Sequence, residues 1–172
     1  MGRSNSPSDA ALKRLPLILP LLAVLTLALD QFTKWLIVSH LEPGQAIVPI
    51  PALSAIFDIT YTTNTGVAFG LFKEAGTLFV VVAIVVIVAI LGISRKLPPD
   101  QRLRQVALGL ALGGAFGNLS DRLRIGHVID FIDFHFWPVF NVADSALFIG
   151  VLLLALSTWR ETRQSSIDAG KA

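Results

Sequence analysis

The segment from residue 113 to residue 145 concentrates acidic and amide side chains between two strongly apolar stretches. Its polar residues include Asn118, Asp121, Arg122, Asp130, Asp133, Asn141 and Asp144. A carboxylate at the centre of a membrane helix costs about 2.5–3.5 kcal/mol even on a lenient insertion scale, so acids beside apolar spans indicate a functional site. We therefore expect the chemistry of this protein to lie in this segment.

Asp144 and a second carboxylate could form a catalytic pair. When two carboxyl groups converge beside lipid, desolvation and like-charge repulsion keep one proton shared between them. The ionised group can then activate a water molecule while its partner donates a proton to a carbonyl oxygen. Spacing alone leaves Asp121, Asp130 and Asp133 as possible partners. Asp144 could instead be a simple N-terminal helix cap.

Other chemistries have weaker signals in this sequence. The chain has no Cys, which excludes disulfides, thiolate metal sites and cysteine nucleophiles. Its three histidines, at positions 40, 127 and 135, do not form the H-E-x-x-H pattern of zinc peptidases, so we expect neither a metal nor another cofactor. Ser120 or Ser145 with a histidine base remains an alternative, although no G-x-S motif accompanies them. A small ion-coupled transporter or membrane binding protein using the same acids also remains open.

The composition is that of an integral membrane protein with one domain. Of the 172 residues, 53% are hydrophobic, and the mean hydropathy is +0.69. A helix of about 20 apolar residues crosses a bilayer core of about 30 Å. We therefore predict a mainly α-helical domain over residues 15–159, flanked by tails at 1–14 and 160–172. The four expected spans are residues 15–38, 75–94, 103–120 and 139–159.

The basic residues predict the orientation of these spans. Ten of the 14 Lys and Arg residues lie in residues 1–14, in residues 94–104 or after Trp159. A four-span arrangement places these three segments on one side, and the positive-inside rule makes that side cytoplasmic. The acidic residues then lie at the outer face.

The outer segment from residue 39 to residue 74 predicts a small extracytoplasmic platform. Residues 56–63 are β-branched and aromatic, and turn-forming residues follow at 64–66, which favours a short hairpin or small sheet. Residues 67–72 are apolar and predict a turn or short helix in the membrane interface.

Small residues and charge spacing predict how the helices support the polar segment. Gly109, Gly113 and Gly117 recur every four residues, which is typical of close helix packing. Asp30 and Lys34 are also four apart, and we expect an internal ion pair that ties the first helix to the site.

The end of the third span carries three polar residues with two possible roles. Asp121 and Arg122 could pair as a salt-bridged helix end. Asn118 and Arg122 share a helix face, so they could also hold the backbone of a substrate.

Five ordered motifs resemble those of the bacterial lipoprotein signal peptidases (signal peptidase II). They are D-Q-F-T-K at 30–34, N-T-G-V-A-F at 64–69, G-G-A-F-G-N at 113–118 with Asp121-Arg122, V-I-D-F at 128–131, and F-N-V-A-D at 140–144. The resemblance covers residues 30–145. It implies four transmembrane helices in the bacterial inner membrane, cytoplasmic termini and an active site at the outer face.

The resemblance also implies the activity and the roles of residues. The family substrate is a prolipoprotein whose Cys carries a diacylglyceryl group, and the bond just before that Cys is cut. The motif positions make Asp130 and Asp144 the catalytic aspartates of an endopeptidase and leave Asp133 structural. Further residues would line or support the site: Asn64, Asn118, Arg122, Asn141, Asp30, Lys34 and Asp121. The platform and residues 67–72 would form a mobile cover, and we expect a monomer in contact with membrane lipid and without nucleic acid.

Overall fold

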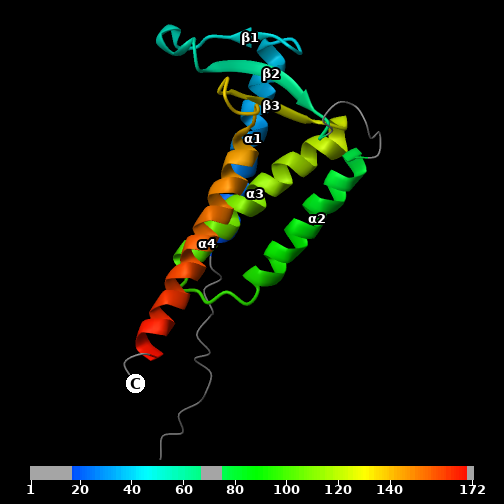
Figure 1. Cartoon of the computed structure of the whole chain (residues 1–172). Coiled ribbons are helices and arrows are strands. Elements are labelled where there is room, and N and C mark those ends of the chain that lie inside the picture. The colour runs from blue at the N-terminus through cyan, green and yellow to red at the C-terminus, as the bar shows by residue number, and fades with distance from the viewer. Residues whose placement is uncertain (1–16, 67–74, 170–172) are drawn as a thin grey trace, which may run out of the picture.

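The computed structural model describes residues 17–66 and 75–169 and shows four helices with a small sheet at one end (Figure 1). The helices are α1 (Ile18–His40), α2 (Ala75–Ser94), α3 (Arg102–Ile125) and α4 (Val142–Ala169). The strands are β1 (Ala46–Ile47), β2 (Asp58–Asn64) and β3 (Val128–Asp133), with a 3-10 turn at Pro51–Leu53. The sheet lies where α1 ends and α4 begins.

Three helices are long and apolar enough to cross a membrane: Ile18–His40, Gly76–Ser94 and Val142–Gln164. Their outer faces carry large exposed apolar side chains; Leu21 is 58% exposed, Val85 61% and Phe148 70%. Exposed apolar area on this scale is typical of surfaces that face lipid. The described chain is therefore a mainly helical membrane protein with three candidate spans. The fourth expected crossing, by α3, stays a prediction because charged residues occupy both ends of that helix.

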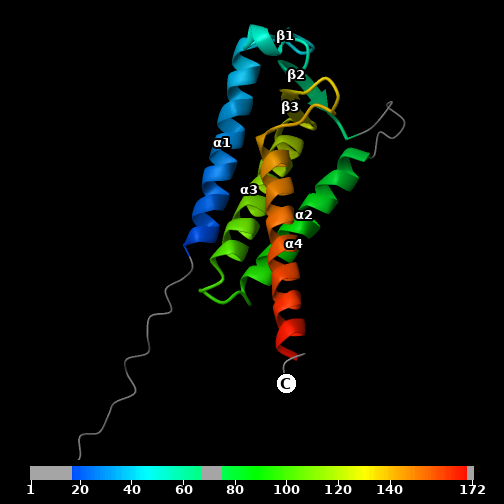
Figure 2. The same ribbon diagram turned by 60° about the vertical axis from the view of Figure 1, so that its left-hand side comes forward.

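α3 lies between the other helices and contacts each of them (Figure 2). The glycine spacing predicted close packing of this helix, and the structure confirms it. A Cβ atom on Gly113 would lie 2.6 Å from the carbonyl oxygen of Ala23 on α1, and one on Gly109 would lie 2.8 Å from that of Leu19. On the opposite side, a Cβ atom on Gly150 of α4 would lie 2.6 Å from the carbonyl oxygen of Ala107. Backbone therefore packs on backbone on two faces of α3.

α1 buries a single face against α3 and α4. Its buried residues are Leu19, Ala23, Thr26, Asp30 and Lys34, which recur every three or four positions as one side of a helix requires. This buried face is apolar near the N-terminal end and charged near the sheet. The charged end of α1 thus enters the polar site.

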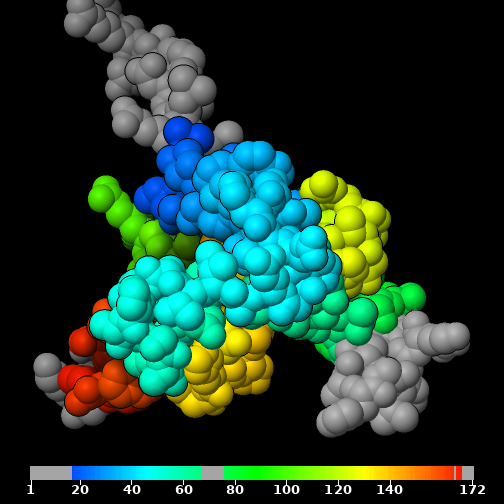
Figure 3. All heavy atoms as spheres, turned by 90° about the horizontal axis from the view of Figure 1, so that it is seen from above, coloured from blue at the N-terminus to red at the C-terminus, as the bar shows by residue number. Residues whose placement is uncertain are grey.

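The sheet is antiparallel with the order β1-β2-β3, and the segment that follows α1 covers the centre of this end of the molecule (Figure 3). The prediction of a short hairpin or small sheet is therefore confirmed in the form of a small sheet. β2 pairs with β1 before it and with β3 after α3. The β-branched run correctly predicted a strand, and its second partner, β3, lies between the third and fourth expected spans. Residues 67–72, where we predicted an interfacial helix, lie outside the described residues.

The close approach of α1 and α3 can be tested with one methyl group. Gly113→Ala should lower the free energy of unfolding by about 1–3 kcal/mol, the usual cost of overpacking, because the new Cβ meets the α1 backbone. Gly92→Ala on α2 is the matched control, since its Cβ meets nothing within 4 Å. Unfolding of both variants would be followed by circular dichroism in detergent. Equal stability of the two variants would contradict the packing.

Candidate active site

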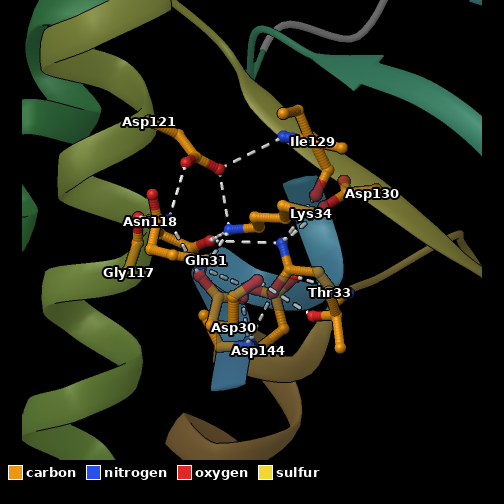
Figure 4. Close-up of polar contacts among 12 residues, drawn as sticks. Asp30, Gln31, Thr33, Lys34, Gly117, Asn118, Asp121, Ile129, Asp130 and Asp144 are labelled. Atoms are coloured by element: carbon orange, nitrogen blue, oxygen red, sulfur yellow. Dashed lines mark hydrogen bonds and ion pairs between the residues drawn. The ribbon is translucent and has the colours of Figure 1, made fainter. Parts of the chain in front are cut away.

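Residues from four elements converge under the sheet (Figure 4). α1 contributes Asp30 and Lys34, and α3 contributes Asn118 and Asp121. Asp130 comes from the middle of β3, while Asn141 and Asp144 lie at the start of α4. Most of these residues lie on helices or strands, which hold their side chains more rigidly than loops would.

Lys34 is the centre of a buried ionic cluster. Its ammonium group lies 2.9 Å from Asp30 Oδ2 and 2.7 Å from Asp121 Oδ2, and it donates to Asn118 Oδ1 at 3.2 Å. The side chain is only 2% exposed, so all three of its N–H groups are used inside the protein. The expected pair of Asp30 and Lys34 is confirmed.

Asp121 pairs with Lys34 and not with its neighbour Arg122, so the predicted salt-bridged helix end is wrong. The reason is the close packing of α3 on α1: a Cβ on Gly117 would lie 2.5 Å from Asp30 Oδ2. This approach brings Lys34 within reach of α3. Asp121 also accepts hydrogen bonds from the Gln31 side chain at 2.9 Å and from the Ile129 amide at 3.4 Å.

Asp30 joins α1 to α4. Its Oδ1 atom accepts a hydrogen bond from the backbone amide of Ala143 at 2.9 Å. Ala143 lies in the first turn of α4, where backbone N–H groups have no partner within the helix and the helix dipole favours a negative charge. A carboxylate of one helix thus caps another, and its side chain is 0% exposed.

Asn141 and Asp144 form a reciprocal cap at the start of α4. Asn141 Oδ1 accepts from the Asp144 amide at 2.8 Å, and Asp144 Oδ2 accepts from the Asn141 amide at 3.4 Å. This is a capping box with an Asp in the place usually taken by Glu. The capping reading of Asp144 is therefore correct in part. Its other oxygen, Oδ1, leaves the box and accepts from Asn118 Nδ2 at 2.6 Å.

Asp130 lies almost fully buried beside an irregularity in the sheet. The pairing of β2 with β3 shifts between Ile59 and Thr62, just before the Thr62–Asp130 pair. Such bulges re-aim side chains next to functional sites. The carboxylate of Asp130 accepts from Asn64 Nδ2 and from Asn141 Nδ2, each at 2.7 Å.

The surroundings of Asp130 raise its pKa above the ordinary value for an aspartate. Burial is the main cause, because it disfavours the charged form. The nearby negative charge of Asp144 acts in the same direction, while the hydrogen bonds from Asn64 and Asn141 oppose the rise. Asp130 is therefore inclined to hold a proton.

Two asparagine side chains connect Asp130 with Asp144. Asn141 donates to Asp130 and also to Asn118 Oδ1 at 3.1 Å, and Asn118 donates to Asp144. Among the candidates that spacing left open, Asp130 alone shares a hydrogen-bond partner with Asp144 within the described residues. Asp121 belongs to the Lys34 cluster, and Asp133 lies opposite Asp58 at the other end of the β2–β3 pairing.

Arg122 lies beside this pair, on the side of α2. Its guanidinium donates to the carbonyl oxygen of Asn118 at 3.3 Å and lies 5.2 Å from the centre of the Phe79 ring. Its Nε atom is buried and has no hydrogen-bond partner within the described part of the chain. The structure thus leaves one donor of Arg122 unused.

Two pockets reach Asp144 from opposite sides. One, of about 190 Å³, lies between α2, α3 and α4 and is lined by Phe79, Val82, Asn118, Arg122 and Leu147, among others. The other, of about 450 Å³, is aromatic, and its lining includes Phe134, Phe136, Trp137, Phe140 and Phe148. An apolar peptide that occupied both would pass Asp144.

The serine alternative finds no support in the described geometry. Ser145 donates its hydroxyl to the Asn141 carbonyl oxygen at 2.9 Å. Its prospective base His135 instead contacts Asp58 and the Ala55 carbonyl oxygen near the outer sheet. No hydrogen bond joins a serine to a histidine among the described residues.

Sequence reasoning missed two residues of the site. Gln31 bonds Asp121 and also accepts from Arg124 at 3.0 Å; its place between Asp30 and Lys34 in the D-Q-F-T-K motif was a usable signal. Phe79 lies in an apolar run of α2, and no local signal distinguishes it from its neighbours.

Comparison with known proteins identifies the family. Residues 22–160 match the family model described as signal peptidase (SPase) II. The lipoprotein signal peptidase of Moorella thermoacetica is 46% identical over 134 residues, which cover 78% of this chain and 87% of that protein. That of Geobacter metallireducens is 45% identical over 158 residues, covering 88% of this chain and 96% of that protein.

A solved structure described as a bacterial membrane enzyme has the same fold. It superimposes with a TM-score of 0.72 at 34% identity and covers 83% of this chain and 87% of its own. The match of the family model over most of the chain, together with relatives aligned over nearly their full length, shows that this chain belongs to the signal peptidase II family.

Proposed function

We propose that this chain is a membrane aspartic endopeptidase that removes the signal peptide of a diacylglyceryl-modified prolipoprotein by cutting just before the lipidated Cys. Membership of the signal peptidase II family supports the removal of signal peptides from prolipoproteins. The observation that carries the aspartic mechanism is the linkage of buried Asp130 to Asp144 through Asn141 and Asn118. Asp144 also borders two largely apolar pockets of the kind an apolar peptide needs.

The two aspartates divide the proton chemistry between them. Asp130, whose pKa is raised, holds the shared proton. Asp144 acts as the base in this proposal, and its carboxylate, in the first turn of α4, accepts one side-chain N–H from Asn118 and one backbone N–H from Asn141. This division is the one that an acid and a base in a single site require.

Hydrolysis then follows in two steps. Asp144 takes a proton from water, the water oxygen bonds to the scissile carbonyl carbon, and Asp130 donates its proton to the carbonyl oxygen. In the second step Asp144 gives its proton to the amide nitrogen, the C–N bond breaks, and a hydroxyl of the diol returns a proton to Asp130. The two carboxyl groups end in their starting states.

Asparagine and arginine side chains hold the peptide backbone in this proposal. Asn64 is partly exposed and can exchange its bond to Asp130 for one to substrate. Arg122 offers its unused Nε donor to a carbonyl oxygen. Asn118 and Asn141 keep the aspartates in position, and the Lys34 cluster fixes Asn118 from below.

Lipid determines which precursors are cut. Each buried methylene contributes about 0.8 kcal/mol, so two acyl chains concentrate the substrate in the bilayer and fix the depth of its scissile bond. The exposed apolar faces of α1, α2 and α4 support this contact with membrane lipid.

The same reasoning proposes the arrangement in the membrane. α3 completes four crossings over residues 15–159, both tails are cytoplasmic, and the sheet lies at the outer face of the inner membrane. Residues 105–120 of α3 carry no charge and pack against the other three helices. This part of α3 would cross the membrane, and its charged residues would lie at the two ends of the crossing. The enzyme acts as a monomer in this proposal.

A small transporter, the other candidate, lacks comparable support. Asp30 and Asp121 both form ion pairs with the same Lys34 ammonium group, so neither carboxylate is free to bind a transported ion. The alternative would also leave the convergence of Asp130 and Asp144 without a role.

The peptidase proposal predicts that Asp130→Asn and Asp144→Asn abolish cleavage of a lipidated precursor while the protein still inserts and extracts normally. Each amide keeps the packing but cannot shuttle the proton. Asp133→Asn is the control and should retain substantial activity. Cleavage would be measured by mass spectrometry on detergent-purified protein, with lipidated and unlipidated forms of the same precursor.

The unlipidated precursor should be cut far more slowly, as a lower kcat/KM in the same micelles. Equal values for both forms would remove lipid from substrate selection but leave the aspartic mechanism standing. An active Asp130→Asn variant beside an inactive Asp133→Asn variant would refute the assignment of the pair.

The raised pKa of Asp130 predicts how stability depends on pH. The folded state binds this proton more tightly than the unfolded state, whose aspartates titrate at about pH 4. The contribution of Asp130 to stability is therefore fully present below the pKa of the unfolded state and is lost as pH rises through the pKa of the folded state. Wild-type protein should show an apparent Tm that falls with rising pH in this window.

Asp130→Asn should reduce that slope, and Asp133→Asn should leave it in place. Thermal unfolding of the three proteins in the same detergent, over a series of buffers, makes the comparison. A slope that survives unchanged in Asp130→Asn would show that Asp130 is not the group that holds the proton.

The membrane arrangement predicts the location of inserted reporters. Fusions after Lys96 and after Ala172 should report the cytoplasm, and one near Gly44 should report the outside, because the basic segments stay inside. Opposite locations for Lys96 and Ala172 would mean that α3 and α4 do not cross as a pair.

A further inference from the structure

Phe79 is the contribution of α2 to the proposed active site. α2 has no charged residue, and Phe79 is half-buried near its start. The Phe79 ring lines the pocket that also contains Asn118, Arg122 and Asp144. The guanidinium of Arg122 lies over this ring, 5.2 Å from its centre, in the geometry of a cation–π contact.

The ring also contacts the end of β2. A Cβ atom on Gly66 would collide with Cδ2 and Cε2 of Phe79, so the Gly66 backbone lies directly against the ring. Gly66 has a φ of 78°, which a residue with a side chain rarely adopts. Its amide donates to Asn64 Oδ1 at 2.8 Å, and Asn64 in turn donates to Asp130.

These contacts form a closed circuit of residues around the two aspartates. From Phe79 one branch runs through Gly66 and Asn64 to Asp130. The other branch runs through Arg122 and Asn118, whose carbonyl oxygen accepts from the guanidinium and whose Nδ2 donates to Asp144. Asn141 completes the circuit by bonding both Asn118 and Asp130. Phe79 is the one member of this circuit that comes from α2.

The unused donor of Arg122 indicates that this circuit could take part in binding a ligand. A buried N–H group without a partner is costly, and a catalytic or binding role is one of the reasons for which native proteins keep such a group. A peptide in the pocket between α2, α3 and α4 would bring carbonyl oxygens to this side of Arg122. The guanidinium must then already be held in place when the peptide arrives.

We propose that Phe79 is a positioning residue of the peptidase: its ring face holds the Arg122 guanidinium so that the Nε–H can bind a carbonyl oxygen of the substrate. The inference rests on the proposed function, and it adds a residue that no motif of the chain contains. A purely space-filling role would be served equally well by an aliphatic side chain. A cation–π role requires an aromatic face, so the two can be separated.

The test measures kcat/KM for a lipidated precursor with three substitutions at one position. Phe79→Leu and Phe79→Met keep an apolar side chain but remove the aromatic face, and they should lower kcat/KM by about fivefold to thirtyfold, as a partly desolvated cation–π contact implies. Phe79→Tyr keeps the face and should stay close to wild type. Leu78→Ala, on the exposed side of α2, is the matched control and should have no effect.

A double-mutant cycle with Arg122→Ala tests whether Phe79 acts through Arg122. In that background Phe79→Leu should cause little further loss, because the group it positions is absent. Apparent Tm values confirm that each variant is folded, and Phe79→Met replaces Phe79→Leu if the latter fails to fold.

Three results would overturn the proposal: full activity of Phe79→Leu, equal impairment of Phe79→Leu and Phe79→Tyr, or an undiminished effect of Phe79→Leu in the Arg122→Ala background. Asp144→Asn distinguishes this failure from that of the peptidase itself. If Asp144→Asn is inactive and Phe79→Leu is fully active, only the role of Phe79 falls. If Asp144→Asn cleaves like wild type, the proposed aspartic mechanism falls.

Discussion

The ammonium group of Lys34 is the contact on which the polar interior depends. Taking a charge out of water costs several kcal/mol, and removing one partner of a buried pair typically costs about 3–5 kcal/mol. Lys34 offsets this by binding Asp30, Asp121 and Asn118 together. Each of these partners reaches a different structural element: Asp30 caps α4, Asp121 bonds the start of β3, and Asn118 bonds Asp144. One lysine therefore fixes the positions of α1, α3, α4 and β3 relative to one another.

This organisation separates support from chemistry. The Lys34 cluster carries two carboxylates and one ammonium group, and its hydrogen-bonding capacity is used internally, so it is suited to be static. Within the described residues, Asp130 and Asp144 have amide partners and no ammonium partner of their own. Neutral amides favour the charged form of a carboxyl group less strongly than a lysine does. In the proposed mechanism this environment suits a pair that exchanges a proton.

Sequence and structure agree where the determining interaction is local. The four-residue spacing of Asp30 and Lys34 predicted their pair, the glycine repeat predicted the packing of α3, and the charge-free run predicted α2. Contacts between distant segments were not predictable in the same way. Lys34 meets Asp121 because two helices pack closely, and β2 pairs with β3 across all of α2 and α3. Spacing left three partners for Asp144, and the fold alone shows which of them shares its amides.

The pocket between α2, α3 and α4 has a kinetic consequence. Its walls belong to helices whose outer faces are apolar and exposed, so in the proposed function a lipidated precursor reaches Asp144 by diffusing within the plane of the bilayer. For such an enzyme the relevant concentration is the mole fraction of precursor among the surrounding lipids, and dilution of the aqueous phase leaves it unchanged. Encounter then becomes a two-dimensional search, whose rate depends on membrane area and lipid fluidity.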